Sequence, residues 1–127
     1  MIKLQMFFEV KPEKCKAFEE MYANTYVPAL RLQKGYTGSM LLRLFPPAVV
    51  KEIAAAPTIF NYQMELIFDT EENRRRWVKS SEHIAAWDIA VSFVESYEWK
   101  GYDVAGTDHV TYSLRTSRSV TRTSGKK

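Results

Sequence analysis

The chain has 127 residues, a length typical of one domain, and its hydrophobic content of 46% supports a packed core and excludes a mostly disordered chain. No apolar run approaches the ~20 residues of a membrane-spanning helix, and the N-terminal segment lacks the apolar stretch and cleavage site of a signal peptide. The net charge of +3 comes from segment 115–127, where no aromatic residue interleaves the basic ones, so nucleic-acid binding is not expected.

Alternating apolar residues predict a first strand over 2–10. Its apolar face holds Ile2, Leu4, Met6, Phe8 and Val10. Pro12 then opens a helix whose apolar positions recur at helical spacing, and Pro28 should kink or end that helix. Two glycines within 33–38 break the pattern before a second strand over 36–45. The more apolar face of this strand carries Tyr36, Met40, Leu42 and Leu44.

The second half of the chain repeats the order of strand, helix and strand. Residues 46–57 are bounded by prolines and predict a loop with at most a short helical turn. A third strand over 59–69 presents one apolar face, made of Phe60, Tyr62, Met64, Leu66 and Phe68. Asp69 is expected to cap the next helix, with Glu72 completing a capping box.

The sequence Ser-Ser-Glu at 80–82 should interrupt this helical region, and Ser80 or Ser81 should cap a second helix that runs to about Val94. One side of that helix carries Ile84, Trp87, Val91 and Val94. Residues 97–106 predict the fourth strand, and 109–114 either add a short fifth strand or lead into the tail. We interpret 1–106 as one domain and 107–127 as a basic, Ser- and Thr-rich extension that lacks the apolar residues needed to order it.

The predicted order β-α-β-β-α-β indicates a ferredoxin-like α+β fold, with helices covering one face of an antiparallel sheet. The other face is mixed. Its expected members are apolar Phe7, Leu41, Ile67 and Trp99 among polar Gln5, Glu9, Arg43, Gln63 and Glu65. An apolar surface of this size is typical of an interaction site, so we predict that two copies pair through it as a homodimer. The single cysteine, Cys15, cannot form an internal disulfide, and we expect a cytoplasmic location.

Four segments carry a resemblance to a known family. They are FEVKPEK (8–14), PALRLQKGYTGSMLLR (28–43), FDTEENRRRWVKSSEH (68–83) and YEWKGYDVAG (97–106). In this order they resemble the antibiotic biosynthesis monooxygenases, a family of dimeric α+β barrels, over residues 1–106. The resemblance implies a pocket between sheet and helices. Its implied activities are cofactor-independent oxidation of polyketide or quinol-like aromatics and haem degradation, and some members have no known activity.

By this family resemblance, His83 matches the histidine of quinol-oxidising members. The same resemblance implies that the pocket is bordered by Trp77, His83 and Trp87. A helix-start position disfavours imidazolium, so a neutral His83 could take a phenolic proton as a general base. The two tryptophans could stack a flat ring. The alternative is that these residues only pack the core and hydrogen-bond locally.

Other polar side chains have two possible roles each. By periodicity, Tyr22, Tyr26 and Tyr62 point toward the same interior, where either internal hydrogen bonds or a ligand must satisfy their hydroxyls. Arg43 could bind a carboxylate or pair with Glu9 or Glu65 across the sheet. The run ENRRRW at 72–77 is interpreted as a solvated helix face.

The leading functional hypothesis is a homodimeric monooxygenase-like enzyme that oxidises an aromatic phenol, quinol or polyketide-type substrate with O₂ and needs no cofactor or metal. In it, Trp77 and Trp87 stack the ring, His83 deprotonates it, and Tyr26 or Tyr62 orients it. The alternative is a non-catalytic dimer that binds a small aromatic molecule. Haem cleavage is not expected, because the haem-ligating position of the haem degraders falls nearer Trp87 and residues 2–10 lack their asparagine.

Overall fold

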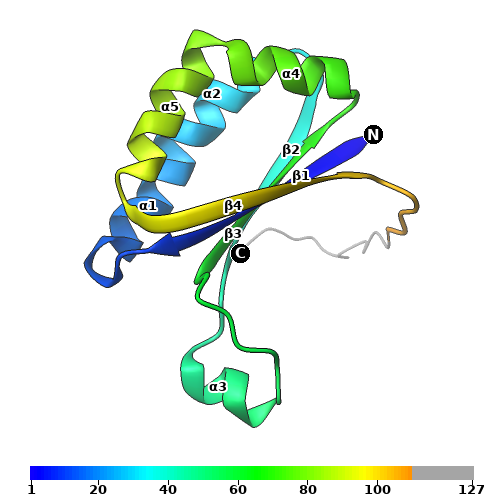
Figure 1. Ribbon diagram of the computed structural model, residues 1–127. Helices are drawn as coiled ribbons and strands as arrows, with labels where there is room; N and C mark the ends of the chain where they lie inside the picture. The colour runs from blue at the N-terminus through cyan, green and yellow to red at the C-terminus, as the bar shows by residue number, and fades with distance from the viewer. Residues whose placement is uncertain (110–127) are drawn as a thin grey trace, which may run out of the picture.

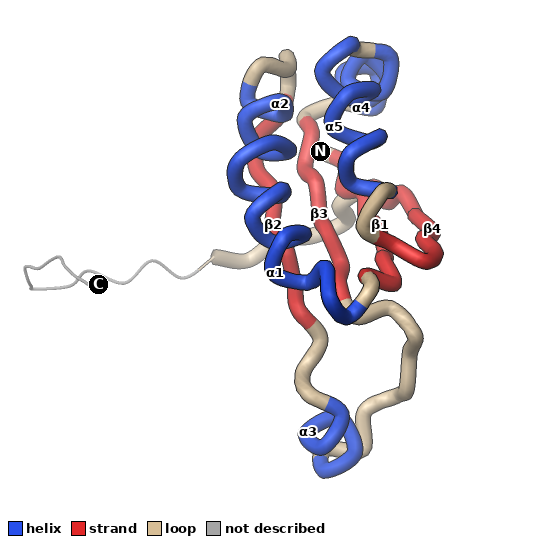
Figure 2. The backbone as a smooth tube through the Cα atoms, turned by 90° about the vertical axis from the view of Figure 1, so that its left-hand side faces the viewer, coloured by secondary structure: helices blue, strands red, loops and turns tan. Residues whose placement is uncertain are grey.

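The computed structural model describes residues 1–109, and these residues form the predicted ferredoxin-like α+β fold (Figure 1). Four antiparallel strands make one sheet in the order β2-β3-β1-β4. They are β1 (Ile2–Val10), β2 (Tyr36–Arg43), β3 (Tyr62–Phe68) and β4 (Val94–Asp103). The main helices all lie on one side of the sheet, which leaves its other face uncovered (Figure 2). Apart from residues 107–109, the basic extension and the alternative fifth strand lie outside the described residues.

The first helical region runs from Pro12 to Arg31 with a change of geometry in the middle. Its parts are η1 (Pro12–Lys14), α1 (Cys15–Met21), the π-helical η2 (Tyr22–Tyr26) and α2 (Val27–Arg31). Pro28 lacks an N–H, and its ring crowds the carbonyl of Asn24 four residues earlier. Widening the preceding turn relieves this conflict, so the proline distorts the helix without ending it.

The β2–β3 connection carries α3 (Pro47–Glu52), the short helical turn expected between the prolines. It projects beyond the end of the sheet (Figure 1). The second helical region is divided as predicted into α4 (Glu71–Lys79) and α5 (Ser81–Val91). Ser80 caps α5, since its Oγ accepts a hydrogen bond from the backbone N–H of His83 at 3.1 Å.

The cap of α4 and the inner face of α5 differ from the prediction. Thr70, not Asp69, is the N-cap, because Thr70 Oγ1 accepts from the backbone N–H of Asn73. The Asp69 carboxylate accepts instead from the side-chain amide of Asn73. The buried residues of α5 are the small Ala86 and Ala90, while Ile84 is exposed. Val94 belongs to β4, because the helix ends at Val91.

The predicted inner face of the second strand is correct at Tyr36 and wrong after it, and a β-bulge is the reason. The register between β2 and β3 shifts between Tyr36 and Gly38, which reverses the alternation of all later residues. Leu41 therefore packs against the core, and Met40 is 55% exposed on the open face. Leu42 and Leu44 are also partly exposed, and Arg43 lies on the helix side together with Leu41.

Trp99 was also expected on the open face, and the structure places it on the helix side. In the antiparallel pair of β1 and β4, Trp99 lies opposite Met6 and Tyr97 lies opposite Phe8. Paired residues of this kind share one face of the sheet. Because Met6 and Phe8 are buried beneath the helices, Tyr97 and Trp99 face the same layer.

Candidate functional site

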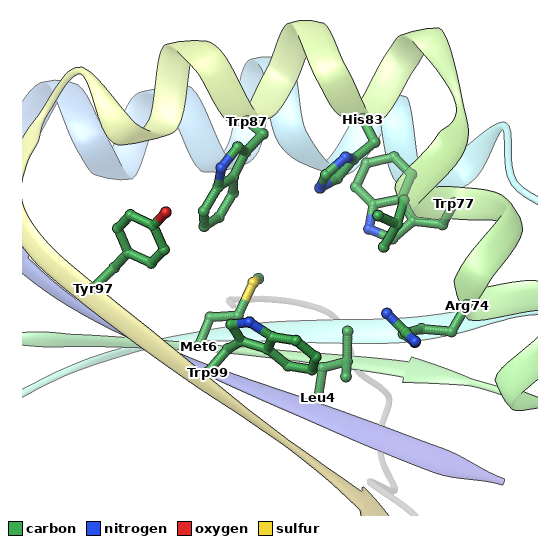
Figure 3. A pocket seen from close by; sticks show the side chains of 9 residues that line it. Leu4, Met6, Arg74, Trp77, His83, Trp87, Tyr97 and Trp99 are labelled. Carbon is green, nitrogen blue, oxygen red and sulfur yellow. The ribbon is translucent and has the colours of Figure 1, made fainter.

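A cavity of about 230 Å³ opens between helices α4 and α5 and the strands β1 and β4 (Figure 3). Nine residues line it: Leu4, Met6, Arg74, Trp77, Val78, His83, Trp87, Tyr97 and Trp99. The wall is mostly aromatic and aliphatic. An imidazole, a guanidinium and a phenol are its polar side chains. Trp99 is 53% exposed and Tyr97 is 49% exposed, so the cavity is open to solvent on the β4 side.

His83 lies between two tryptophans at the helical roof of this cavity (Figure 3). Its ring centroid is 4.8 Å from that of Trp77, edge to face, and 6.0 Å from that of Trp87, nearly parallel at 15°. Trp87 follows His83 by one helical turn, so both side chains leave α5 on the same side. Trp77 reaches the same point from the last turn of α4, because the helical region is interrupted at Ser80, where the backbone turns extended between the two helices.

The imidazole of His83 has the properties of a neutral base at pH 7. Burial lowers its pKa, while the backbone carbonyl of Val78 and the carboxylate of Asp88 act in the opposite direction. The direction agrees with the prediction, but burial, not the helix terminus, is the main cause. The Nδ1 atom is buried and makes no hydrogen bond to any residue within 1–109. Such an imidazole can accept a proton from a bound hydroxyl group.

Trp77 divides the cavity from the core. Its side chain is 1% exposed, and its other neighbour is Tyr26, whose ring lies edge to face at 5.7 Å. Tyr26 is fully buried, and burial raises the pKa of its phenol. Its hydroxyl has no hydrogen-bond partner in the described part of the chain. Tyr26 thus lies behind Trp77 and does not line the cavity.

The other two predicted tyrosines lie away from this cavity, Tyr22 in η2 and Tyr62 in β3, and neither lines it. The Tyr22 hydroxyl is 2.6 Å from Ser39 Oγ, and the Tyr62 hydroxyl donates to Glu19. The structure therefore separates three phenols that periodicity placed together. The helices cover the two halves of the sheet separately. Periodicity tells that a side chain points toward the core, but it does not tell over which half of the sheet the side chain lies.

Arg43 pairs with Glu19 of α1 and not with Glu9 or Glu65. Its Nε and Nη2 donate to the two carboxylate oxygens at 2.8 and 2.9 Å. The β2 bulge explains this, because it turns Arg43 toward the helices. The hydrogen bonds from Arg43, and then from Tyr62, lower the pKa of Glu19 to about 2. This cluster is internally satisfied and separate from the aromatic cavity.

Sequence reasoning missed three cavity residues that carry polar or aromatic groups: Arg74, Tyr97 and Trp99. Arg74 lies three residues before Trp77 and so shares its helix face, a spacing that could have distinguished it from its solvated neighbours. Its side chain is only 14% exposed. To predict that Tyr97 and Trp99 line the cavity, one would need the register of β4 against β1, which the sequence alone does not provide.

Residues 1–109 hold no group of three His, Cys, Asp or Glu side chains that could bind a metal ion. Within the same residues, no helix has the length and apolar character needed to cross a membrane. The cytoplasmic location expected from Cys15 stays a prediction.

Comparison with known proteins supports the structural resemblance. No protein-family model matches the sequence, and no curated protein sequence matches it. A putative antibiotic biosynthesis monooxygenase from Nitrosomonas europaea superposes with a TM-score of 0.62 at 14% identity, covering 84% of this chain and 100% of the other. SnoaB, a cofactor-independent oxygenase from Streptomyces nogalater, gives 0.62 at 15% identity, covering 84% and 93%.

A dimeric ferredoxin-like protein of unknown function from Thermobifida fusca also gives a TM-score of 0.62, at 13% identity, covering 81% of this chain and 90% of the other. The chain therefore has the ferredoxin-like fold found in antibiotic biosynthesis monooxygenases. At these identities the shared property is the fold, and the activity must be argued from the cavity itself.

Proposed function

We propose that this protein is a monooxygenase-like enzyme that oxidises an aromatic phenol, quinol or polyketide-type substrate with O₂ and without a cofactor. The observation that carries the proposal is His83, a partly buried imidazole held between two indole rings on the wall of an aromatic cavity. The fold shared with SnoaB, itself a cofactor-independent oxygenase, supports the same chemistry.

In the proposed reaction, the substrate ring enters the cavity through its open side and packs against Trp87 and Trp99. The neutral imidazole of His83 removes a phenolic proton, which raises the electron density of the ring. The ring carbon that becomes electron-rich reduces O₂, and a C–O bond forms to give a peroxide. Loss of the hydrogen on that carbon and cleavage of the O–O bond leave one oxygen as a carbonyl, and the other oxygen departs as water with the proton that His83 returns. A phenol with a free ring C–H and O₂ thus give a quinone and H₂O, since the C–H and O–H hydrogens both end in the water.

Oxygen consumption tests this proposal. Purified protein should consume O₂ with at least one member of a panel of phenols and quinols that runs from one-ring compounds to three-ring, anthrone-like ones. His83→Ala should lower that rate by about a hundredfold or more, since general bases contribute roughly 10²–10⁴-fold. In the wild type the rate should fall as the pH drops through the pKa of His83, because protonated imidazole cannot accept the proton.

The second histidine of the chain provides a matched control for this experiment. His109 is exposed and does not line the cavity, so His109→Ala should keep the full rate. Equal rates in the wild type and His83→Ala would contradict the role of His83 as the base.

The second candidate function is a non-catalytic protein that binds a small aromatic molecule. One observation favours it: within 1–109 no carboxylate hydrogen-bonds to the His83 imidazole and its Nδ1 has no partner, whereas catalytic bases are commonly oriented by a third group. On this alternative, wild-type protein would bind aromatic ligands without consuming O₂, and His83→Ala would bind them almost as well.

We also propose that the active form is a homodimer joined through the uncovered sheet face. Because of the bulge in β2, this face carries apolar Phe7, Met40, Leu42 and Ile67 around Glu65. The dimeric protein of the same fold from Thermobifida fusca supports the proposal. Light scattering should give twice the mass of one chain, and Met40→Lys should shift the protein toward the monomer. A wild-type monomer at micromolar concentration would contradict it.

A further inference from the structure

Arg74 is the one permanently charged side chain on the wall of the aromatic cavity within the described residues. Its guanidinium carbon lies 5.8 Å from the ring centroid of Trp99, and the side chain points from α4 toward the cavity (Figure 3). This distance is within the range of a cation–π contact, which does not use the N–H groups at the edges of the guanidinium. Arg74 is thus positioned beside the aromatic wall that a flat ligand would contact.

The ion pair of Arg74 leaves part of its hydrogen-bonding capacity free. Its Nε and Nη2 donate to Glu71 at 2.9 and 2.5 Å. Guanidinium carries five N–H donors, so these two bonds leave three. The carboxylate of Glu71 also accepts from Arg75 at 3.0 Å and is 46% exposed, so solvent and a second arginine weaken its hold on Arg74.

The surrounding charges limit where an anion can lie. A second cavity of about 290 Å³ adjoins the first and shares Leu4, Arg74 and Trp99 with it. Its wall includes the carboxylates of Glu71 and Asp103, which would repel an anion. On the side of the first cavity, Arg74 faces no acidic lining residue. A negative group is therefore favoured only where Arg74 meets the aromatic cavity.

We propose that Arg74 makes this cavity selective for aromatic carboxylates of one or two rings, with the ring against Trp87 and Trp99 and the carboxylate at the guanidinium. The inference rests on the proposed aromatic cavity and specifies its ligand class. A volume of about 230 Å³ is smaller than the ~300–1,000 Å³ typical of sites for drug-sized ligands, which favours a compact ring system. Planar, two-pronged recognition of a carboxylate is a common role of arginine.

Two matched probes test the inference: naphthalene carboxylate and the neutral naphthalene carboxamide of the same shape. The three tryptophans of the chain all line the cavity, so intrinsic fluorescence reports on binding there. Wild-type protein should bind the carboxylate about tenfold or more tightly than the amide, as expected for a charge-assisted hydrogen bond. Arg74→Gln should remove this preference, chiefly by weakening the binding of the carboxylate.

Arg75→Gln is the matched control, because Arg75 also pairs with Glu71 but is 69% exposed and does not line the cavity. It should keep the preference for the carboxylate over the amide, and thermal melts of both variants should show folded protein. Equal affinity of the wild type for the two probes would overturn the role of Arg74 while leaving the aromatic cavity in place. Failure of both probes to bind would overturn both the inference and the proposed site.

Discussion

Gly35→Ala is expected to destabilise the protein by about 3 kcal/mol, since left-handed backbone strain costs roughly 1–2 kcal/mol and overpacking roughly 1–3 kcal/mol. Gly35 has a φ of +82°, a conformation that favours glycine. A Cβ atom there would also meet the side chain of Asp69 and come within 2.6 Å of Asn73 Nδ2 and 2.8 Å of Asn73 Cβ. Chemical denaturation of the variant would measure the loss.

The site of this clash explains why the substitution should also affect the cavity. Asp69 immediately precedes the N-cap of α4 and is bonded to Asn73 in its first turn, and the backbone N–H of Asp69 donates to Gly35 O at 2.9 Å. Moving them would shift Arg74 and Trp77, which follow on the same helix. Gly38→Ala is the control, because a Cβ at Gly38 meets nothing within 4 Å. Equal stability of the two variants would contradict the packing described around Gly35.

Trp77→Ala should lower the free energy of unfolding by about 3–5 kcal/mol, as expected when a buried tryptophan leaves a cavity. Trp77 is 1% exposed and packs between Tyr26 and His83. Trp99→Ala should cost less than about 1 kcal/mol, because Trp99 is 53% exposed. The affinity for an aromatic ligand should nevertheless fall in Trp99→Ala, since its ring forms the open wall.

This pair of variants distinguishes a core residue from a wall residue. Urea denaturation would give the two stabilities, and fluorescence titration of Trp99→Ala with naphthalene carboxylate would give the affinity. A small stability loss in Trp77→Ala would contradict its core role. Unchanged ligand affinity in Trp99→Ala would show that β4 does not contribute to the site.

The alternation of β1 and β3 and the break at Ser80 could be predicted from the sequence. These features depend on local periodicity and on caps, which act over a few residues. The grouping of Trp77, His83 and Trp87 followed only from the family resemblance, because helical spacing left the relation of the two tryptophans open across that break. The inner face of β2 could not be predicted, because one bulge after Tyr36 reversed it. Within residues 36–45, Gly38 is the strongest sequence signal for that bulge.

The opposite wall of the cavity depends on contacts between distant parts of the chain. Trp99 faces the helices because β4 pairs with β1 so that Trp99 lies opposite Met6. A register one residue different would have placed it on the open face, as was expected. The same lack of long-range information allowed Tyr22 and Tyr62 to be grouped with His83, although their hydroxyls bond to Ser39 and Glu19.

The most direct test of the central claim, that His83 deprotonates a bound phenol, is an anaerobic absorption titration with a nitro-substituted phenol, whose phenolate absorbs at longer wavelength and whose pKa is low enough for an imidazole to accept its proton. Excluding O₂ separates proton removal from oxidation. At a pH just below the pKa of the free phenol, wild-type protein should produce the phenolate spectrum of the bound phenol, and His83→Ala should bind the same phenol without that change. A bound phenol that keeps its neutral spectrum in the wild type would contradict the account.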